Sequence, residues 1–70
     1  MVRRASLRSV RERKQFTQRD IAEKLKLTET AYRNIETGRN KPSFITAIKL
    51  SKILETPIES LFDVDFLITV

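Results

Sequence analysis

A row of polar side chains between residues 28 and 37 is the part of this sequence best suited to specific recognition chemistry. The row consists of Thr28, Glu29, Thr30, Arg33, Asn34 and Thr37. Residues three or four apart lie on one side of a helix, so these side chains would share one polar face. Base pairs present donors, acceptors and the thymine methyl group in the major groove of DNA, and such side chains can contact them. The alternative interpretation is an ordinary solvated helix face.

Side chains suited to catalysis or metal binding are scarce. The sequence has no cysteine and no histidine, which removes the thiol nucleophile, the thiolate ligand and the commonest general base. Asp63 and Asp65 have no third ligand nearby in the sequence, and the serines have no base partner other than lysine. We therefore expect no catalytic residue, no metal site and no cofactor, and we expect that the protein is not an enzyme.

Length and charge favour one small domain with a polyanionic partner. A chain of 70 residues with formal charge +5 forms a single domain that buries a modest core. Residues 1–41 hold twelve lysines and arginines against five acids, and residues 42–70 hold two against four. This uneven charge suits a nucleic acid on the basic side, although a solvated surface gives the same pattern. No apolar run is long enough for a signal or a membrane span, so the expected location is the cytoplasm.

Helix start and stop signals divide the chain into five short helices. Thr17-Gln18-Arg19-Asp20 and Thr56-Pro57-Ile58-Glu59 both have the spacing of a capping box, each with a threonine as N-cap. Thr28 and Ser43 are expected to cap the third and fourth helices. Gly38, the only glycine, stands where a left-handed residue would end the third helix.

Apolar residues predict how these helices pack. Residues 18–37 have the spacing of a helix-turn-helix, with the small residue Ala22 where the two helices come closest. The inward residues of this unit are Ile21, Leu25, Leu27, Tyr32 and Ile35. The helix ending near Leu54 is expected to be the most buried, because its apolar stripe is wider than a coiled-coil seam. That stripe consists of Phe44, Ala47, Ile48, Leu50, Ile53 and Leu54.

Taken in order, these motifs resemble the XRE family, the Cro/repressor type of helix-turn-helix found in phage repressors and small bacterial regulators. The matching stretches cover roughly residues 5–62. They are Leu7-x-x-Val10-Arg11, Phe16-Thr17-Gln18-x-x-Ile21-Ala22-x-x-Leu25, Tyr32-x-x-Ile35-Glu36-x-Gly38-Arg39, Pro42-Ser43 and Leu50-x-x-Ile53-Leu54 followed by Leu61-Phe62. The resemblance implies an all-α, compact, five-helix lambda-repressor-like DNA-binding domain over residues 1–62.

The resemblance also implies base-reading residues. In the family the positions of Glu29, Thr30, Arg33 and Asn34 face base edges, and Thr28 lies beside them. Arg33 would bind guanine O6 and N7, Asn34 adenine N6 and N7, and Thr30 a thymine methyl group. For Glu29 two roles stay open, which are acceptance from a cytosine amino group and repulsion of wrong sequences.

Backbone contacts and a structural ion pair follow from the same resemblance. Gln18 would donate its amide to a phosphate at the start of the second helix. The expected phosphate-binding residues are Thr17, Gln18, Arg19, Thr37, Arg39, Asn40 and Lys41. Arg11 and Glu36 would pair as a partly buried salt bridge. Tyr32 is expected in the core, with its hydroxyl reaching solvent or a phosphate.

The sequence departs from the family where the chain turns. Lys26 stands in the turn between the second and third helices, where the family usually has glycine. Gln15 and Glu55 also stand where glycine is common. A lysine in left-handed conformation costs about 1–2 kcal/mol, so the sequence predicts a turn at Lys26 that is either strained or rearranged.

The last eight residues, 63–70, form a separate strand-like extension in this interpretation. Val64, Phe66, Ile68 and Val70 alternate with other residues at strand periodicity. We expect these four residues to mediate dimerisation, and the alternative is a tail folded over its own core or without fixed structure. A two-fold dimer would place two recognition helices about 34 Å apart on a palindromic operator.

The resulting functional hypothesis is a sequence-specific DNA-binding transcriptional regulator that acts as a homodimer on double-stranded DNA. A repressor is favoured because repression needs only occupancy of a promoter. An activator or restriction-modification controller protein is not separated from it by sequence. A further alternative is an antitoxin-type interaction module whose acidic C-terminal half binds a basic toxin.

Overall fold

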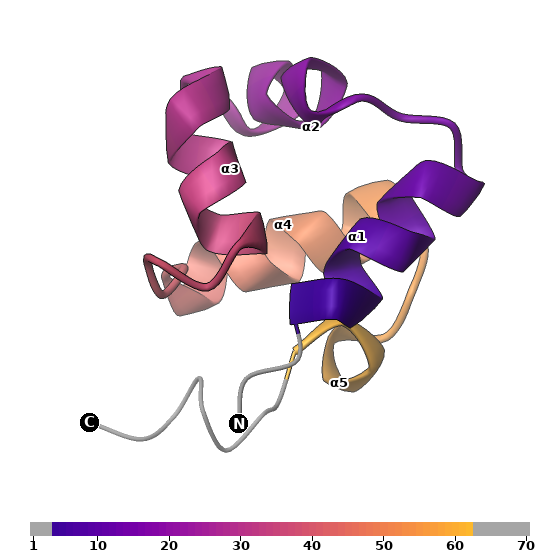
Figure 1. Cartoon of the computed structure of the whole chain (residues 1–70). Coiled ribbons are helices and arrows are strands. Elements are labelled where there is room, and N and C mark those ends of the chain that lie inside the picture. The colour runs from indigo at the N-terminus through magenta and orange to yellow at the C-terminus, as the bar shows by residue number, and fades with distance from the viewer. Residues whose placement is uncertain (1–3, 63–70) are drawn as a thin grey trace.

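Five α-helices account for the regular structure of residues 4–62, which are the residues that this computed structural model describes. They are α1 (Arg4–Arg13), α2 (Gln18–Leu25), α3 (Glu29–Glu36), α4 (Phe44–Leu54) and α5 (Ile58–Leu61). Figure 1 shows α2 and α3 meeting at a corner, with α4 and α1 below α2 and α5 at the far end. The expected all-α fold is confirmed. The proposed dimerisation residues Val64, Phe66, Ile68 and Val70 lie outside the described residues.

Three of the four predicted side-chain caps are present. The hydroxyl of Thr17 accepts from the Asp20 backbone N–H at 3.0 Å, and the Asp20 carboxylate accepts from the Thr17 N–H at 2.9 Å, which completes a capping box. Thr28 accepts from the N–H of Ala31, and Ser43 from the N–H of Thr46. These hydroxyls satisfy backbone donors that a helix start leaves open.

The predicted capping box at Thr56 is wrong. Pro57 occupies the N-cap position of α5, and no side chain caps this four-residue helix. The Thr56 hydroxyl donates to the Leu54 carbonyl at 2.9 Å, and the Thr56 carbonyl accepts from Ser51 at 2.6 Å. The end of α4 leaves carbonyls open, and the Thr56 hydroxyl satisfies one of them instead of capping the next helix.

Three helices end on a residue other than glycine in left-handed conformation. The φ angle is 65° at Gln15, 60° at Lys26 and 52° at Glu55. At Lys26 the backbone N–H donates to the Glu23 carbonyl at 3.1 Å, and the next N–H reaches the Ala22 carbonyl at 2.9 Å. This pair of hydrogen bonds is a Schellman motif, and the same pattern recurs at Gln15 and Glu55. Of the two outcomes expected at Lys26, the structure therefore has the left-handed, strained turn and not a rearranged one.

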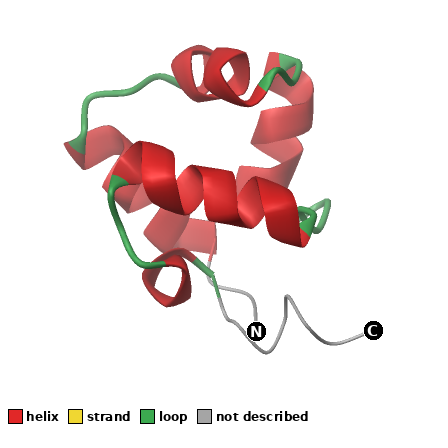
Figure 2. Ribbon diagram, turned by 180° about the vertical axis from the view of Figure 1, so that it is seen from behind, coloured by secondary structure: helices red, strands yellow, loops and turns green. Residues whose placement is uncertain are grey.

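The core is one cluster to which every helix contributes. It consists of Leu7, Val10, Ile21, Ala22, Leu25, Tyr32, Ile35, Ala47, Leu50, Leu54, Leu61 and Phe62. Phe16 and Leu27, which follow the left-handed turns, are partly buried against it. Seen from behind in Figure 2, α4 runs across the molecule and carries the chain to α5.

The helix α4 is expected to be the most buried one, but the start of its apolar stripe is exposed. Ala47, Leu50 and Leu54 are buried, whereas Phe44 is 53% exposed and the neighbouring Ile45 is 62% exposed. The helix packs against α2 and α5 on one side, so a stripe this wide is only partly covered.

Candidate nucleic-acid interface

The helix α3 presents one side to the core and the other to solvent. Tyr32 and Ile35 are buried on the inner side. Figures 1 and 2 both place α3 at the edge of the bundle, and no other described helix covers its outer side. Of the six residues in the predicted polar face, Asn34 is half-buried and the others are exposed, namely Thr28, Glu29, Thr30, Arg33 and Thr37. The predicted face therefore exists and is accessible.

Residues expected to bind phosphate lie on both sides of this face. Thr17 and Arg19 are exposed at the N-terminal end of α2, where Gln18 is half-buried. The segment after α3 carries the exposed residues Thr37, Arg39, Asn40 and Lys41. This segment is fastened to the helix, because the Asn34 carbonyl accepts from the Asn40 backbone N–H at 3.1 Å and from the Thr37 hydroxyl at 3.3 Å. Two groups of polar and basic side chains thus flank α3.

A buried ion pair holds the C-terminal end of α3 against α1. The Nε of Arg11 donates to Oε2 of Glu36 at 2.7 Å, and its Nη2 donates to Oε1 at 3.1 Å. The Nη1 of Arg11 donates to the Phe16 carbonyl at 2.8 Å, in the loop before α2. Arg11 and Glu36 are 7% and 6% exposed, so the pair is more deeply buried than the resemblance implied.

Two further donors reach the same carboxylate. The hydroxyl of Tyr32 donates to Oε2 of Glu36 at 2.8 Å, and Nε2 of Gln18 donates to Oε1 at 3.0 Å. Tyr32 is fully buried, so the expectation that its hydroxyl reaches solvent or a phosphate is wrong. A buried carboxylate is costly unless its oxygens accept hydrogen bonds, and these donors satisfy both of them.

The ionisation of this cluster follows from its contacts. Burial alone raises the pKa of Glu36, but the hydrogen bonds from Arg11, Tyr32 and Gln18 together outweigh burial and hold that pKa below its usual value. The hydrogen bond to Glu36 raises the pKa of Arg11. Burial, followed by the bond to Glu36, raises the pKa of Tyr32. At neutral pH the cluster is therefore a charged pair with a neutral phenol.

The side chain of Arg33 is held on the outer face of α3. Its Nε donates to Oε1 of Gln18 at 3.3 Å, and its Nη2 lies 3.4 Å from Oε2 of Glu29. Gln18 therefore uses both ends of its amide within the protein, which the expected role as a phosphate donor did not include. Its amide nitrogen has a second hydrogen, for which residues 4–62 supply no partner.

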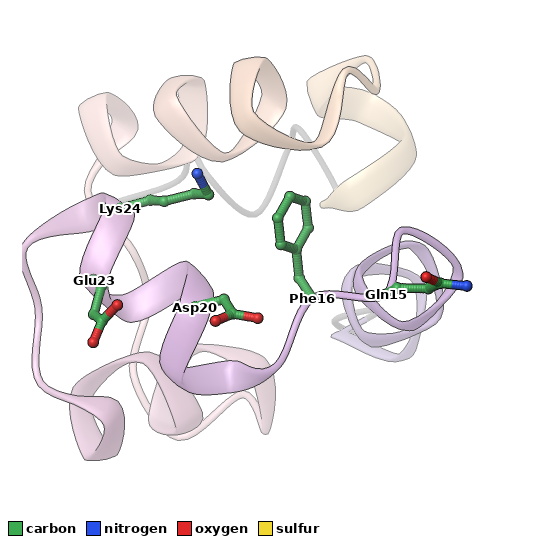
Figure 3. Close-up of a pocket in the computed structure, with 5 residues that line it drawn as sticks. All are labelled: Gln15, Phe16, Asp20, Glu23 and Lys24. Atoms are coloured by element: carbon green, nitrogen blue, oxygen red, sulfur yellow. The ribbon is translucent and has the colours of Figure 1, made fainter.

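A pocket of about 500 Å³ lies away from this face, beside α2. Figure 3 shows its lining residues, with the Lys24 side chain extended toward the ring of Phe16. The Nζ of Lys24 is 5.6 Å from the ring centroid, a cation–π distance.

The described residues contain no cluster of three or more side chains that would hold a metal ion. No helix within residues 4–62 is long and apolar enough to cross a membrane.

Sequence reasoning missed the contacts of Gln18. Its partners Arg33 and Glu36 lie 15 and 18 residues further along the chain, and no spacing rule relates the start of one helix to such positions on the next. A partial signal was present in Glu36, because a carboxylate expected to be partly buried needs several donors.

The protein is of the helix-turn-helix class. Its α2 and α3 are joined by the left-handed turn at Lys26, and one side of α3 is exposed. The family model described as "Helix-turn-helix" matches residues 7–61. The chain therefore belongs to the XRE-type helix-turn-helix family, as its resemblance implied. An uncharacterized HTH-type transcriptional regulator, YqaE of Bacillus subtilis (strain 168), is 36% identical over 56 residues, which are 80% of this chain and 48% of the relative. The chain thus spans about half the length of that relative.

Proposed function

We propose that the protein is a sequence-specific transcriptional regulator that lays α3 in the major groove of double-stranded DNA. The observation that supports this proposal is the outer side of α3, where Thr28, Glu29, Thr30, Arg33 and Asn34 form an accessible polar face. The opposite side of the same helix is fixed by the buried pair of Arg11 and Glu36. A rigid support of this kind suits a helix that must keep its register against base edges.

In this proposal Arg33 binds guanine O6 and N7, Asn34 binds adenine N6 and N7, and Thr30 touches a thymine methyl group. Thr28 lies at the start of the same face, and Glu29 accepts from a cytosine amino group or repels wrong sequences. The flanking groups bind phosphates and fix the register without reading sequence. They are Thr17, Gln18 and Arg19 on one side and Thr37, Arg39, Asn40 and Lys41 on the other.

Selection of binding sites from random duplex DNA tests this function. The wild-type protein is expected to select a palindromic consensus, and Arg33→Ala and Asn34→Ala are each expected to lose the preference at one base pair of every half-site. Each lost contact is worth about 1–3 kcal/mol of discrimination. Binding without sequence preference, or an identical consensus in both variants, would contradict the proposal.

We propose further that the protein acts as a homodimer and as a repressor. A two-fold pair would place two copies of α3 about one DNA turn apart, which explains a palindromic site. The dimerisation residues proposed from the sequence are Val64, Phe66, Ile68 and Val70. The masses in solution of the full chain and of a chain ending at Phe62 should then differ by a factor of two. A promoter that carries the selected site is expected to lose transcription when the protein is present, and a rise would indicate an activator.

A further inference from the structure

Two contacts hold one edge of the Arg33 guanidinium. Its Nε donates to Gln18 at 3.3 Å, and its Nη2 lies 3.4 Å from the carboxylate of Glu29. Both nitrogens belong to the side edge of the group, where the Nε hydrogen and one Nη2 hydrogen point in the same direction. Arg33 is thus held in the free protein from two different helices.

The Gln18 side of this clamp is anchored in the core. The amide nitrogen of Gln18 donates to Oε1 of Glu36 at 3.0 Å, and that carboxylate is 6% exposed and bound by Arg11. The carbonyl oxygen of the same amide therefore points to Arg33 from a fixed position. The Glu29 side is a more exposed contact, because Arg33 and Glu29 are 49% and 45% exposed and lie one helical turn apart.

The clamp formed by Gln18 and Glu29 does not contact the outer edge of the Arg33 guanidinium. A guanidinium has five N–H groups in one plane, and the side edge uses two of them. The remaining hydrogens are on Nη1 and on the outer side of Nη2, and two of them are parallel. Two parallel donors match O6 and N7 of guanine in the major groove.

We propose that Gln18 and Glu29 are positioning residues that hold Arg33 by its side edge, so that its outer edge is already directed toward guanine before DNA binds. This inference rests on the proposed function of α3. Holding a long side chain in advance lowers the ordering cost of binding. The clamp also adds a requirement for guanine, because another base at that position does not offer two acceptors to the outer edge.

The positioning role makes a different prediction from the direct roles of these residues. Loss of the phosphate contact of Gln18 weakens binding to all sequences alike. Loss of a positioning contact reduces the preference for guanine at the one base pair that Arg33 reads. A direct contact of Glu29 with cytosine would instead change the preference at a base pair that Arg33→Ala leaves unchanged.

The experiment measures the dissociation constants of the selected DNA site and of sites with each other base at the position read by Arg33. That position is defined as the one where Arg33→Ala abolishes the preference. Glu29→Ala and Gln18→Ala are each expected to lower the preference for guanine about 2- to 5-fold, the size of an exposed ion-pair effect. In the Arg33→Ala background neither substitution should change the preference further.

Glu23→Ala is the matched control, because Glu23 is an exposed carboxylate on α2 that lies outside the proposed interface. It removes the same charge as Glu29→Ala and should leave the preference for guanine unchanged. If Glu29→Ala and Gln18→Ala keep the wild-type preference while Arg33→Ala abolishes it, the positioning role is overturned and the proposed function stands. If Arg33→Ala itself changes no preference, the proposed function fails at that residue. Glu29 is exposed, so its variant is expected to fold and keeps the test decisive.

Discussion

Arg11 donates two hydrogen bonds to Glu36, at 2.7 and 3.1 Å, and so joins the last turn of α1 to the last residue of α3. Both residues are less than a tenth exposed. Removing two charges from water costs about as much as their attraction returns, so the pair adds little net stability. Its effect is geometric, because it fixes the orientation of α3 from a helix 25 residues earlier in the chain.

Arg11→Ala is expected to destabilise the protein by about 3–5 kcal/mol, because the substitution leaves Glu36 buried without its ion-pair partner. This is a large part of the roughly 4–10 kcal/mol that 70 residues provide, and urea unfolding measures it. Arg8→Ala is the matched control on the same helix. Arg8 pairs with Glu12 at 3.2 Å with both side chains more than half exposed, so its loss should cost no more than about 1 kcal/mol. Equal costs would contradict the structural role of the buried pair.

Tyr32→Phe should have an effect that depends on pH. The hydroxyl donates to the ionised carboxylate of Glu36, and such a bond contributes about 1.5–3 kcal/mol. The pKa of Glu36 is lower in the folded protein than in the unfolded chain, so the folded state binds fewer protons. The stabilisation is therefore fully present above the pKa that Glu36 has in the unfolded chain, which is about 4.3. It is lost as the pH falls through the lower pKa that Glu36 has in the folded protein.

Urea unfolding of the wild type and of Tyr32→Phe at pH 7, 5, 4 and 3 checks this expectation. The difference in unfolding free energy should be largest at pH 7 and should shrink as the pH falls and Glu36 becomes protonated in the folded protein. Asp20→Asn provides a separate comparison, because the Thr17 backbone N–H lowers the pKa of Asp20 in the same direction without touching this cluster. A Tyr32→Phe difference that is constant with pH would show that the phenol does not stabilise the carboxylate.

Local features of this fold were predictable from sequence because their causes are local. The caps at Thr17, Thr28 and Ser43 each need one hydroxyl three residues before a backbone N–H, and the spacing shows this directly. The left-handed turn at Gly38 has φ 85°, as its glycine indicated. At Thr56 the same spacing failed, because the end of the preceding helix competes for the hydroxyl.

The hydrogen-bond network of the site was not predictable, because it depends on contacts between helices. The resemblance implied the pair of Arg11 and Glu36, but neither its depth nor the donors that join it follow from spacing. Tyr32 was placed in the core correctly, yet the direction of its hydroxyl required the position of Glu36. The exposure of Phe44 likewise depends on how far neighbouring helices extend beside α4.

Lys26→Gly is expected to stabilise the protein by about 1 kcal/mol. Lys26 has φ 60° and ψ 40°, a conformation that costs an L-residue about 1–2 kcal/mol and glycine almost nothing, although glycine also loses more entropy on folding. For a domain of this size the gain corresponds to a rise of about 4–8 °C in the melting temperature. Thermal unfolding followed by circular dichroism measures it.

Lys49→Gly is the control for this substitution, because it makes the same chemical change at an exposed position within α4. Glycine in a helix interior costs about 1 kcal/mol relative to alanine, so this variant should melt at a lower temperature than the wild type. Two variants that shift the melting temperature in the same direction would show that the left-handed turn stores no strain.

Arg39→Ala is expected to weaken binding to every DNA sequence by the same factor. The reason is that Arg39, which follows the end of α3, is proposed to contact a phosphate. The slope of log K against log salt concentration should fall in magnitude by about 0.9, the value for one phosphate contact. Lys52→Ala is the control. It removes the same charge in the last turn of α4, at the end that Figures 1 and 2 place away from α3, and should leave the slope unchanged. If Arg39→Ala instead changed the preference at one base pair, Arg39 would read sequence, and the polar face of α3 would extend beyond its helix.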